Sequence, residues 1–179
     1  MSLIEFIQIE KSFKNQKVIK GVNLLLNEKD FFGLLGKSGS GKTTLMRLLI
    51  GFYRVDNGRI LYRHEDVTRN PEKIRRAVGF CTQDNSFYPE LTVEENLLYY
   101  GRLYGISTPL LKMRISKVLE QVSLSEHAKK LSKSLSGGMK RRLDLAISLI
   151  HDPVIFGRSR DVGVLDHVAN ISGLILSIT

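Results

Sequence analysis

The sequence has 179 residues, of which 42% are hydrophobic and 25% charged, which excludes a disordered chain and predicts one domain with a sizeable core. The formal net charge is +9, but the basic residues form short runs within helical patterns and lack interleaved aromatic residues, so no nucleic acid partner is expected. The apolar runs are too short to cross a bilayer, and the single cysteine, Cys81, excludes an internal disulfide and fits a reducing cytoplasm.

The N-terminal part of the chain is rich in strand patterns. The segment "LIEFIQIE" alternates between apolar and polar residues, and "KVIKGVNLLLN" is rich in valine, isoleucine and leucine. The run "FFGLLG" is typical of a buried parallel strand, and a helix is predicted after it over residues 43–50. The turn "VDNG" precedes the predicted strand "RILYR", and "RAVGFCT" predicts a further buried strand.

The middle of the chain carries helix signals instead. Thr92 and Glu95 have the spacing of a capping box, so a helix is predicted to begin there. Pro109 is expected to open another helix, and strand signals are absent from about 92 to 150. We therefore predict a mixed α/β core formed by residues 1–86 and 145–179, interrupted by a helical subdomain over residues 87–144.

The segment "GKSGSGKTT" matches the phosphate-binding pattern G-x-x-x-x-G-K-[ST] between a predicted buried strand and a predicted helix. Its glycines let successive N–H groups face one cluster of phosphate oxygens, and the helix start adds its positive end. Lys42 is expected to reach the β- and γ-phosphates, and the Thr43 hydroxyl to bind Mg²⁺. The predicted nucleotide-binding residues of this loop are Gly36, Lys37, Ser38, Gly39, Ser40, Gly41, Lys42, Thr43 and Thr44.

A second glycine motif, "SLSGGMKRRLDLAISLIHDP", begins at Ser134. Ser136, Gly137 and Gly138 place a hydroxyl and two unobstructed N–H groups at the start of a predicted amphipathic helix, which is typical of an anion-binding helix terminus. One chain cannot usefully direct both helix starts at a single triphosphate, whereas two chains arranged head to tail can. The two motifs together therefore favour a nucleotide bound between two subunits.

The sequence resembles the ATP-binding subunits of ABC transporters over essentially its whole length. "LSGGM" is similar to the family signature LSGGQ, and the following "KRRLDLA" is similar to exporter-type subunits. "CTQDNSFYPELTVEENL" resembles the family's Q-loop region, which implies that Gln83 contacts Mg²⁺ and the attacking water. Phe13 stands where the family stacks an aromatic ring on adenine, although a phenylalanine at a strand end also fits a core position.

The resemblance implies a P-loop NTPase (RecA-like) α/β core with an N-terminal antiparallel β subdomain and a helical insertion, incomplete at the C-terminus. It implies ATP and Mg²⁺ as ligands, sandwiched between this chain and a second, identical or different, ATP-binding subunit. It further implies a transmembrane permease partner and a peripheral location on the cytoplasmic face of the membrane. Phe87 and Tyr88 look exposed and suited to a permease helix, or alternatively to local packing.

The acid pair that the family uses for hydrolysis is missing from this sequence. Counting from Pro153, the place of the Mg²⁺-anchoring aspartate falls on Ser159, and that of the water-polarising glutamate on Arg160. We expect the strand that begins with "VIF" to end after Phe156. We reject a two-residue slip that would make Asp161 the aspartate, because it would put two unpaired arginines into a central strand. Arg160 cannot act as a general base, because a guanidinium keeps its proton at neutral pH.

The end of the sequence departs from the family as well. Residues after Asp166 are expected to form a helix, so the family's closing strand and its switch histidine are expected to be absent. None of His64, His127, His151 and His167 falls at the place of that histidine.

Three interpretations of this chain follow. The chain could be an active transport ATPase, a nucleotide-binding subunit with impaired hydrolysis that works beside a competent partner, or a truncated remnant of such a subunit. The residues favour ATP binding without efficient hydrolysis. A non-transport ABC-type ATPase that acts on nucleic acid or ribosomes is the alternative from another class.

Overall fold

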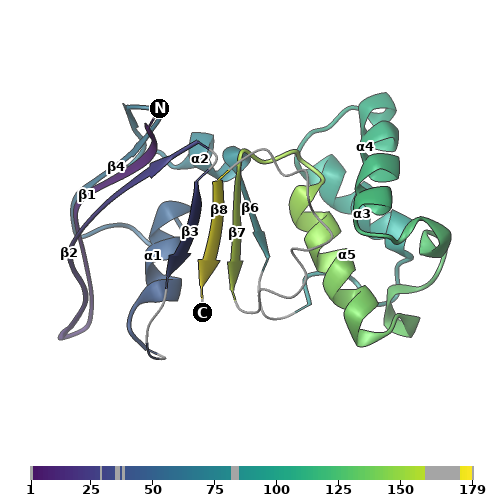
Figure 1. Ribbon diagram of the computed structural model, residues 1–179, viewed down its shortest axis with the longest axis horizontal. Helices are drawn as coiled ribbons and strands as arrows, with labels where there is room; N and C mark the ends of the chain where they lie inside the picture. Colours follow the sequence, from purple (N-terminus) through teal and green to yellow (C-terminus); the bar gives the residue numbers. More distant parts are fainter. Residues whose placement is uncertain are drawn as a thin grey trace. The chain divides into compact units, whose positions relative to one another are not determined.

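The computed structural model describes residues 2–28, 30–34, 37, 39–81, 85–159 and 174–178, and the chain divides into two compact units (Figure 1). The core unit comprises Met1–Val78, Val154–Arg160 and Ser172–Thr179. The helical unit comprises Gly79–Pro153 and Asp161–Ile171.

An antiparallel sheet with the strand order β2-β1-β4-β5 forms the N-terminal part of the core unit. Its strands are β1 (Ser2–Phe13), β2 (Gln16–Asn27), β4 (Asn57–Tyr62) and β5 (Glu65–Asp66). Leu3, Ile4, Phe6 and Ile9 of β1 are all buried, and shifts in the β1–β2 register mark bulges that interrupt the strict alternation of its sequence. The predicted antiparallel β subdomain is thus confirmed.

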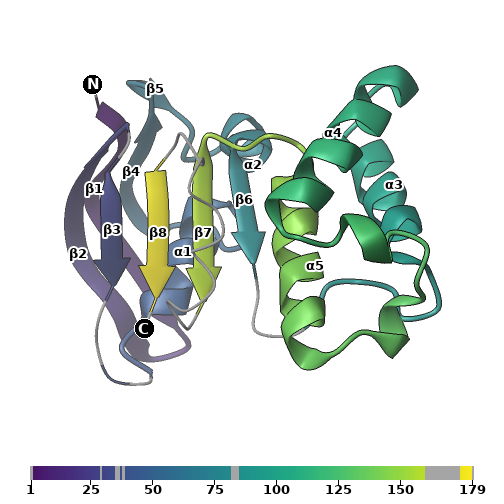
Figure 2. The ribbon, with the colours of Figure 1, turned by 45° about the vertical axis from the view of Figure 1, so that its right-hand side comes forward.

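Parallel strands form the second part of the core unit. They are β3 (Phe31–Leu34), β7 (Ile155–Ser159) and β8 (Leu174–Ile178), and β8 pairs with both β3 and β7 (Figure 2). The register joins Leu34 to Ile178 and Ile178 to Ser159, so the last residues of β3 and β7 lie level at one edge of the sheet. Helices α1 (Lys42–Leu49) and α2 (Glu72–Ala77) complete the unit.

Two expectations for the end of the chain are wrong. Strand β7 does not fail after Phe156 but continues through Gly157 and Arg158 to Ser159, because its backbone pairs with β8 whatever side chains it carries. Residues 174–178 form strand β8 rather than a helix, since the apolar run "LILSI" fits between two parallel strands. Arg160 and Asp161 lie outside the described residues.

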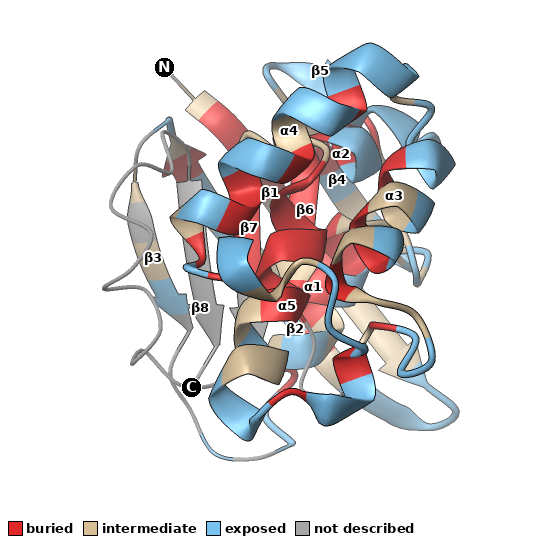
Figure 3. Cartoon of the chain, turned by 90° about the vertical axis from the view of Figure 1, so that its right-hand side faces the viewer, coloured by how far each residue is buried: buried red, intermediate tan, exposed pale blue. Residues whose placement is uncertain are grey.

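The helical unit begins within strand β6 (Val78–Cys81), and its described residues form three α-helices: α3 (Val93–Leu103), α4 (Thr108–Gln121) and α5 (Gly137–Leu149). Two short 3₁₀ turns, η1 (Ser125–His127) and η2 (Ser132–Ser134), lie between α4 and α5. Their buried faces meet one another and their outer faces are exposed (Figure 3). The predicted capping box of α3 is confirmed, because Thr92 and Glu95 each accept a hydrogen bond from the other's backbone N–H.

The side chain of Asn96 is the polar centre of the helical unit. It is fully buried on α3, where its Oδ1 accepts from the Tyr88 N–H at 2.7 Å. Its Nδ2 lies within hydrogen-bonding distance of the carbonyl oxygens of Tyr88 and Thr92, at 3.0 and 2.9 Å, and of Ser132 Oγ at 2.9 Å. One amide therefore ties together the segment before α3, the helix itself and the turn η2.

We expect Asn96→Ala to lower the free energy of unfolding by about 2–3 kcal/mol, because the backbone groups of Tyr88 would lose their partners. Urea denaturation would measure the change, with exposed Asn85→Ala as the control for loss of an asparagine elsewhere in the unit. Equal denaturation midpoints for the two variants would contradict this role of Asn96.

Candidate functional site

The phosphate-binding pattern lies at the start of α1, which directly follows β3 in the core unit. Of the predicted loop residues, Lys37 and residues 39–44 are described, whereas Gly36 and Ser38 lie outside the described residues. Among the described residues, no side chain caps the start of α1, and the first turn of α1 carries no acidic residue. Its first N–H groups and its positive end are therefore available to an anionic ligand.

The surroundings of Gly41 show why this turn requires glycine. It is buried at φ 94°, and a Cβ atom there would lie 2.8 Å from Ile19 Cδ1 and 3.3 Å from the Val18 carbonyl oxygen of β2. Gly39 also has a positive φ of 81°, but a Cβ on it would meet no described atom within 4 Å. Gly41 thus lets the loop lie close to β2, and Gly39 leaves the outer surface of the loop open.

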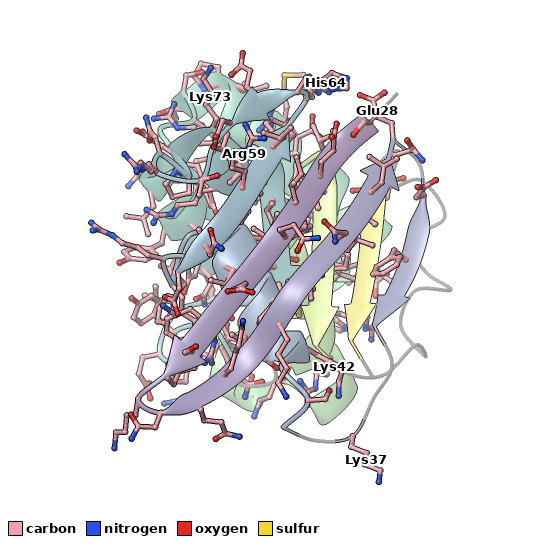
Figure 4. All side chains as sticks on the ribbon, turned by 90° about the vertical axis from the view of Figure 1, so that its left-hand side faces the viewer. Glu28, Lys37, Lys42, Arg59, His64 and Lys73 are labelled. Carbon is pink, nitrogen blue, oxygen red and sulfur yellow. The ribbon has the colours of Figure 1, made fainter. Side chains whose placement is uncertain are left out.

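The side chain of Lys42 folds back over the loop. Its Nζ donates to the Lys37 carbonyl oxygen at 3.0 Å and lies 3.4 Å from Ser40 Oγ, whereas the side chain of Lys37 points away from the ribbon (Figure 4). Thr43, the next residue of α1, is exposed. The ammonium group and the hydroxyl predicted to contact phosphate and metal therefore lie on adjacent residues at the open end of α1.

The remaining predicted residues of the nucleotide site are placed in part. Phe13 ends β1 with 37% of its surface exposed, and its ring centroid lies 5.0 Å from that of Tyr53. Ser159 ends β7 level with Leu34, the last residue of β3, and its side chain lies outside what the structure describes. Gln83 lies outside the described residues.

The second glycine motif forms the start of α5 in the helical unit, as predicted. Ser136 is the N-cap, and its Oγ accepts from the Met139 N–H at 3.3 Å. Gly137 and Gly138 are exposed, and a Cβ on either would meet no described atom within 4 Å. Since packing among the described residues does not require these glycines, they suit a binding partner that approaches the helix start closely.

Of the two alternatives for the aromatic pair before α3, exposure holds for Tyr88 and local packing for Phe87. Tyr88 is exposed at 46% of its surface, as expected, but Phe87 is buried at 8%. The Asn96 side chain binds both backbone groups of Tyr88 and so fixes the chain direction at this point. The sequence alone does not show which of two adjacent aromatic residues is buried.

Asp144 of α5 is a buried carboxylate that sequence reasoning missed. Its Oδ1 accepts from the Ser86 N–H at 2.7 Å, and its Oδ2 is buried with no partner among the described residues. Burial raises the pKa of Asp144 to about 6, against the lowering effects of the Ser86 N–H and of nearby Arg141. The hydroxyl of Tyr100 donates to the Ser86 carbonyl oxygen, so α3 and α5 together fix the segment that follows Gln83.

Within the parts of the chain that the structure describes, no three histidine, cysteine or acidic residues are grouped as metal ligands. Over the same residues, no helix is both long enough and apolar enough to span a membrane.

Comparison with known proteins identifies the family. The model of the ABC transporter family matches residues 19–156, which is more than half of the chain. This chain belongs to the ABC transporter family. The family match includes the phosphate loop, the Q-loop region and the signature motif, so it rests on the segments that carried the resemblance.

Curated relatives and solved structures agree with this assignment. The chain is 34% identical over 151 residues to linearmycin resistance ATP-binding protein LnrL of Bacillus subtilis, covering 84% of this chain and 49% of that protein. It is 39% identical over 150 residues to Nod factor export ATP-binding protein I of Paraburkholderia xenovorans, again covering 84% and 49%. The chain thus spans about half the length of these relatives.

Two solved structures confirm the fold class. An ATP-binding cassette of an ABC transporter in its ADP conformation has a TM-score of 0.87 at 25% identity, covering 99% of this chain and 81% of that one. Clostridium perfringens cbiO1, part of the ABC transporter complex cbiONQ, has a TM-score of 0.88 at 20% identity, covering 99% and 78%.

The raised pKa of Asp144 predicts a specific pH dependence of stability. Because the folded-state pKa is about 6 and the ordinary value is 3.8, the folded chain binds more protons than the unfolded chain between these values. We therefore expect the contribution of Asp144 to the free energy of unfolding to fall by on the order of 2 kcal/mol as the pH rises from about 4 to 7. Asp144→Asn removes this loss, so the stability difference between variant and wild type should change with pH.

Urea denaturation of both proteins at several pH values would measure that difference. Exposed Glu126→Gln serves as the control for removal of a carboxylate from the same unit. Parallel pH profiles for wild type and Asp144→Asn would show that Asp144 has an ordinary pKa.

Proposed function

We propose that this chain is the ATP-binding subunit of an ABC-type membrane transporter, and that it binds Mg·ATP but hydrolyses it inefficiently. The observation that carries the binding proposal is the uncapped start of α1, where Gly39, Gly41 and Lys42 form an open, cationic turn. The names of the curated relatives, which are ATP-binding proteins for export and resistance, support a transport role.

The residues of the core unit fit a nucleoside triphosphate in a defined way. The N–H groups of the loop and of the first turn of α1 would bind the phosphate oxygens. Lys42 would exchange its bond to the Lys37 carbonyl oxygen for the β- and γ-phosphates, which are stronger acceptors because they are charged. The partly exposed ring of Phe13 would stack on the base.

Magnesium would be held mainly by the nucleotide itself. Mg²⁺ usually takes one or two carboxylates together with phosphate oxygens and water, and it neutralises charge on the phosphates. Here Thr43 offers an exposed hydroxyl and Gln83 a carbonyl oxygen, while the place of the family's aspartate holds the neutral Ser159. This donor set fits Mg²⁺ bound to ATP, with fewer anionic protein ligands than the family pattern provides.

The proposal of inefficient hydrolysis rests on the residues at the end of β7. In support of this, Ser159 pairs with the same β8 residue as Leu34, the last residue of β3, and counting along the sequence puts the family's aspartate at Ser159. Arg160 follows it and stays protonated, so it cannot withdraw a proton from water. Loss of a general base typically costs a factor of about 10²–10⁴ in rate.

A second ATP-binding subunit would complete the site. The open start of α5, with Ser136 as N-cap and two exposed glycines, offers N–H groups for the γ-phosphate of a nucleotide bound by another chain. This partner is either a second copy of this chain or a different subunit with its own acid pair. Only a different subunit would allow rapid turnover at one of the two sites.

A transmembrane permease would be the other partner, with this chain held peripherally at the cytoplasmic face of the membrane. The helical unit presents an open groove of about 490 Å³ along α3. Its apolar walls come from Leu91, Leu98, Tyr99 and Leu103, and Glu95 and Arg102 add one charge of each sign. Such a groove suits an amphipathic helix of a permease loop.

Lys42→Ala should abolish measurable binding of Mg·ATP, because the variant lacks the ammonium group that reaches the phosphates. Isothermal titration calorimetry would test this, with Lys73→Ala as the control, since Lys73 is an exposed lysine on α2 that pairs with Glu65 (Figure 4). No heat from well-folded wild type would contradict the proposed function, and unchanged binding by Lys42→Ala would contradict the role of that lysine.

The double substitution Ser159→Asp and Arg160→Glu should raise ATP turnover by a factor of about 10² or more, because it restores a metal-anchoring carboxylate and a general base. Steady-state phosphate release would measure turnover, and adding Lys42→Ala to the double variant should remove the gain. Wild-type turnover equal to that of the restored variant would show that Ser159 and Arg160 do not limit hydrolysis.

A further inference from the structure

We propose that Tyr53 and Asp56, in the loop after α1, are positioning residues that hold the ring of Phe13 in place for the adenine base. The inference rests on the proposed function, because it concerns the base-binding side of the same nucleotide site. All of the residues involved lie in the core unit.

Asp56 fixes the end of β1 next to Phe13. Its Oδ1 accepts from Lys11 Nζ at 2.5 Å, and its Oδ2 accepts from the Ser12 N–H at 2.7 Å. The Asp56 N–H in turn donates to the Glu10 carbonyl oxygen at 3.0 Å. The hydrogen bond from Lys11 and that from Ser12 lower the pKa of Asp56, so the carboxylate stays charged and keeps both bonds at neutral pH.

Tyr53 fixes the ring itself. Its centroid lies 5.0 Å from that of Phe13 with the ring planes at 73°, the edge-to-face arrangement that aromatic pairs favour. Lys11 Nζ lies 5.6 Å from the centroid of Phe13. These two contacts leave 37% of the Phe13 surface exposed, so part of the ring remains available to a base.

Arg47 of α1 fixes Tyr53 in turn. The Tyr53 N–H donates to the Arg47 carbonyl oxygen at 3.2 Å, and Arg47 Nη1 donates to the Tyr53 hydroxyl oxygen at the same distance. The guanidinium also lies 5.8 Å from the Tyr53 centroid. Tyr53 is therefore attached to the C-terminal turn of α1 through backbone and side chain.

The consequence is that one helix supports both ends of the nucleotide. The start of α1 carries the phosphate-binding N–H groups and Lys42, and its last turn carries the loop that holds Phe13. An eight-residue helix is a rigid spacer of roughly 12 Å at 1.5 Å per residue. The distance between the base-contacting ring and the phosphate loop is thus set by α1 and its following loop.

Inorganic tripolyphosphate separates this role from general support of the fold, because it has the phosphates of ATP but no base. We expect Tyr53→Leu, which keeps apolar volume but removes the ring, to weaken Mg·ATP binding roughly three- to tenfold, the usual contribution of one aromatic pair. Its affinity for Mg·tripolyphosphate should equal that of the wild type. Both affinities would be measured by calorimetry.

Two further variants sharpen the test. Tyr53→Phe keeps the edge-to-face contact and loses only the hydroxyl bond to Arg47, so it should lose less ATP affinity than Tyr53→Leu. Asp56→Asn, which weakens the bond to Lys11, should reduce the affinity for Mg·ATP without changing that for Mg·tripolyphosphate. Tyr62→Ala is the control, since Tyr62 is a tyrosine of β4 whose ring contacts Arg63. It should change neither affinity.

The outcomes distinguish this inference from the proposed function. Wild type that binds neither ligand overturns both. Wild type that binds ATP no better than tripolyphosphate shows that Phe13 contributes no base contact. If the wild type prefers ATP to tripolyphosphate, the proposed function stands. If Tyr53→Leu then lowers the affinity for both ligands equally, or for neither, only the positioning role of Tyr53 is overturned.

Discussion

The core unit depends on one tight constraint, the passage of the chain from β3 into α1 close against β2. Gly41 meets this constraint because it adopts a positive φ and has no Cβ that would strike Ile19. The same turn leaves the start of α1 without a side-chain cap, so its N–H groups remain unsatisfied within the helix. A requirement of backbone packing thus creates the anion-binding end on which the proposed nucleotide site is built.

At the end of β7, strand pairing and the chemistry needed for hydrolysis depend on different groups. Strand β7 keeps its pairing with β8 up to Ser159, in level register with β3, even though its sequence contains glycine and arginine. Pairing uses backbone N–H and C=O groups, which every residue here supplies, whereas hydrolysis needs particular carboxylates. Strand pairing can therefore persist whatever side chains follow Phe156, so the fold alone does not determine the chemistry proposed for this end of β7.

Polar side chains that bind backbone groups order the irregular segments of each unit. In the helical unit Asn96 and Asp144 bind backbone groups of residues 86–92, and in the core unit Asp56 does the same for the end of β1. Each of these side chains satisfies N–H groups that no strand or helix pairs. They fix irregular segments, which are the segments that carry the candidate functional residues.

The sequence by itself determined the phosphate loop, the N-cap of α5, the capping box of α3 and most strand positions, because each depends on residues a few positions apart. Only the tertiary structure decided that β8 is a strand, that Phe87 is buried, and that Asp144 and Tyr53 contact Ser86 and Phe13. Asp144 bonds to Ser86 from 58 residues away, and Asp56 to Ser12 from 44. Such contacts leave no local pattern, because their partners become neighbours only when the chain has folded.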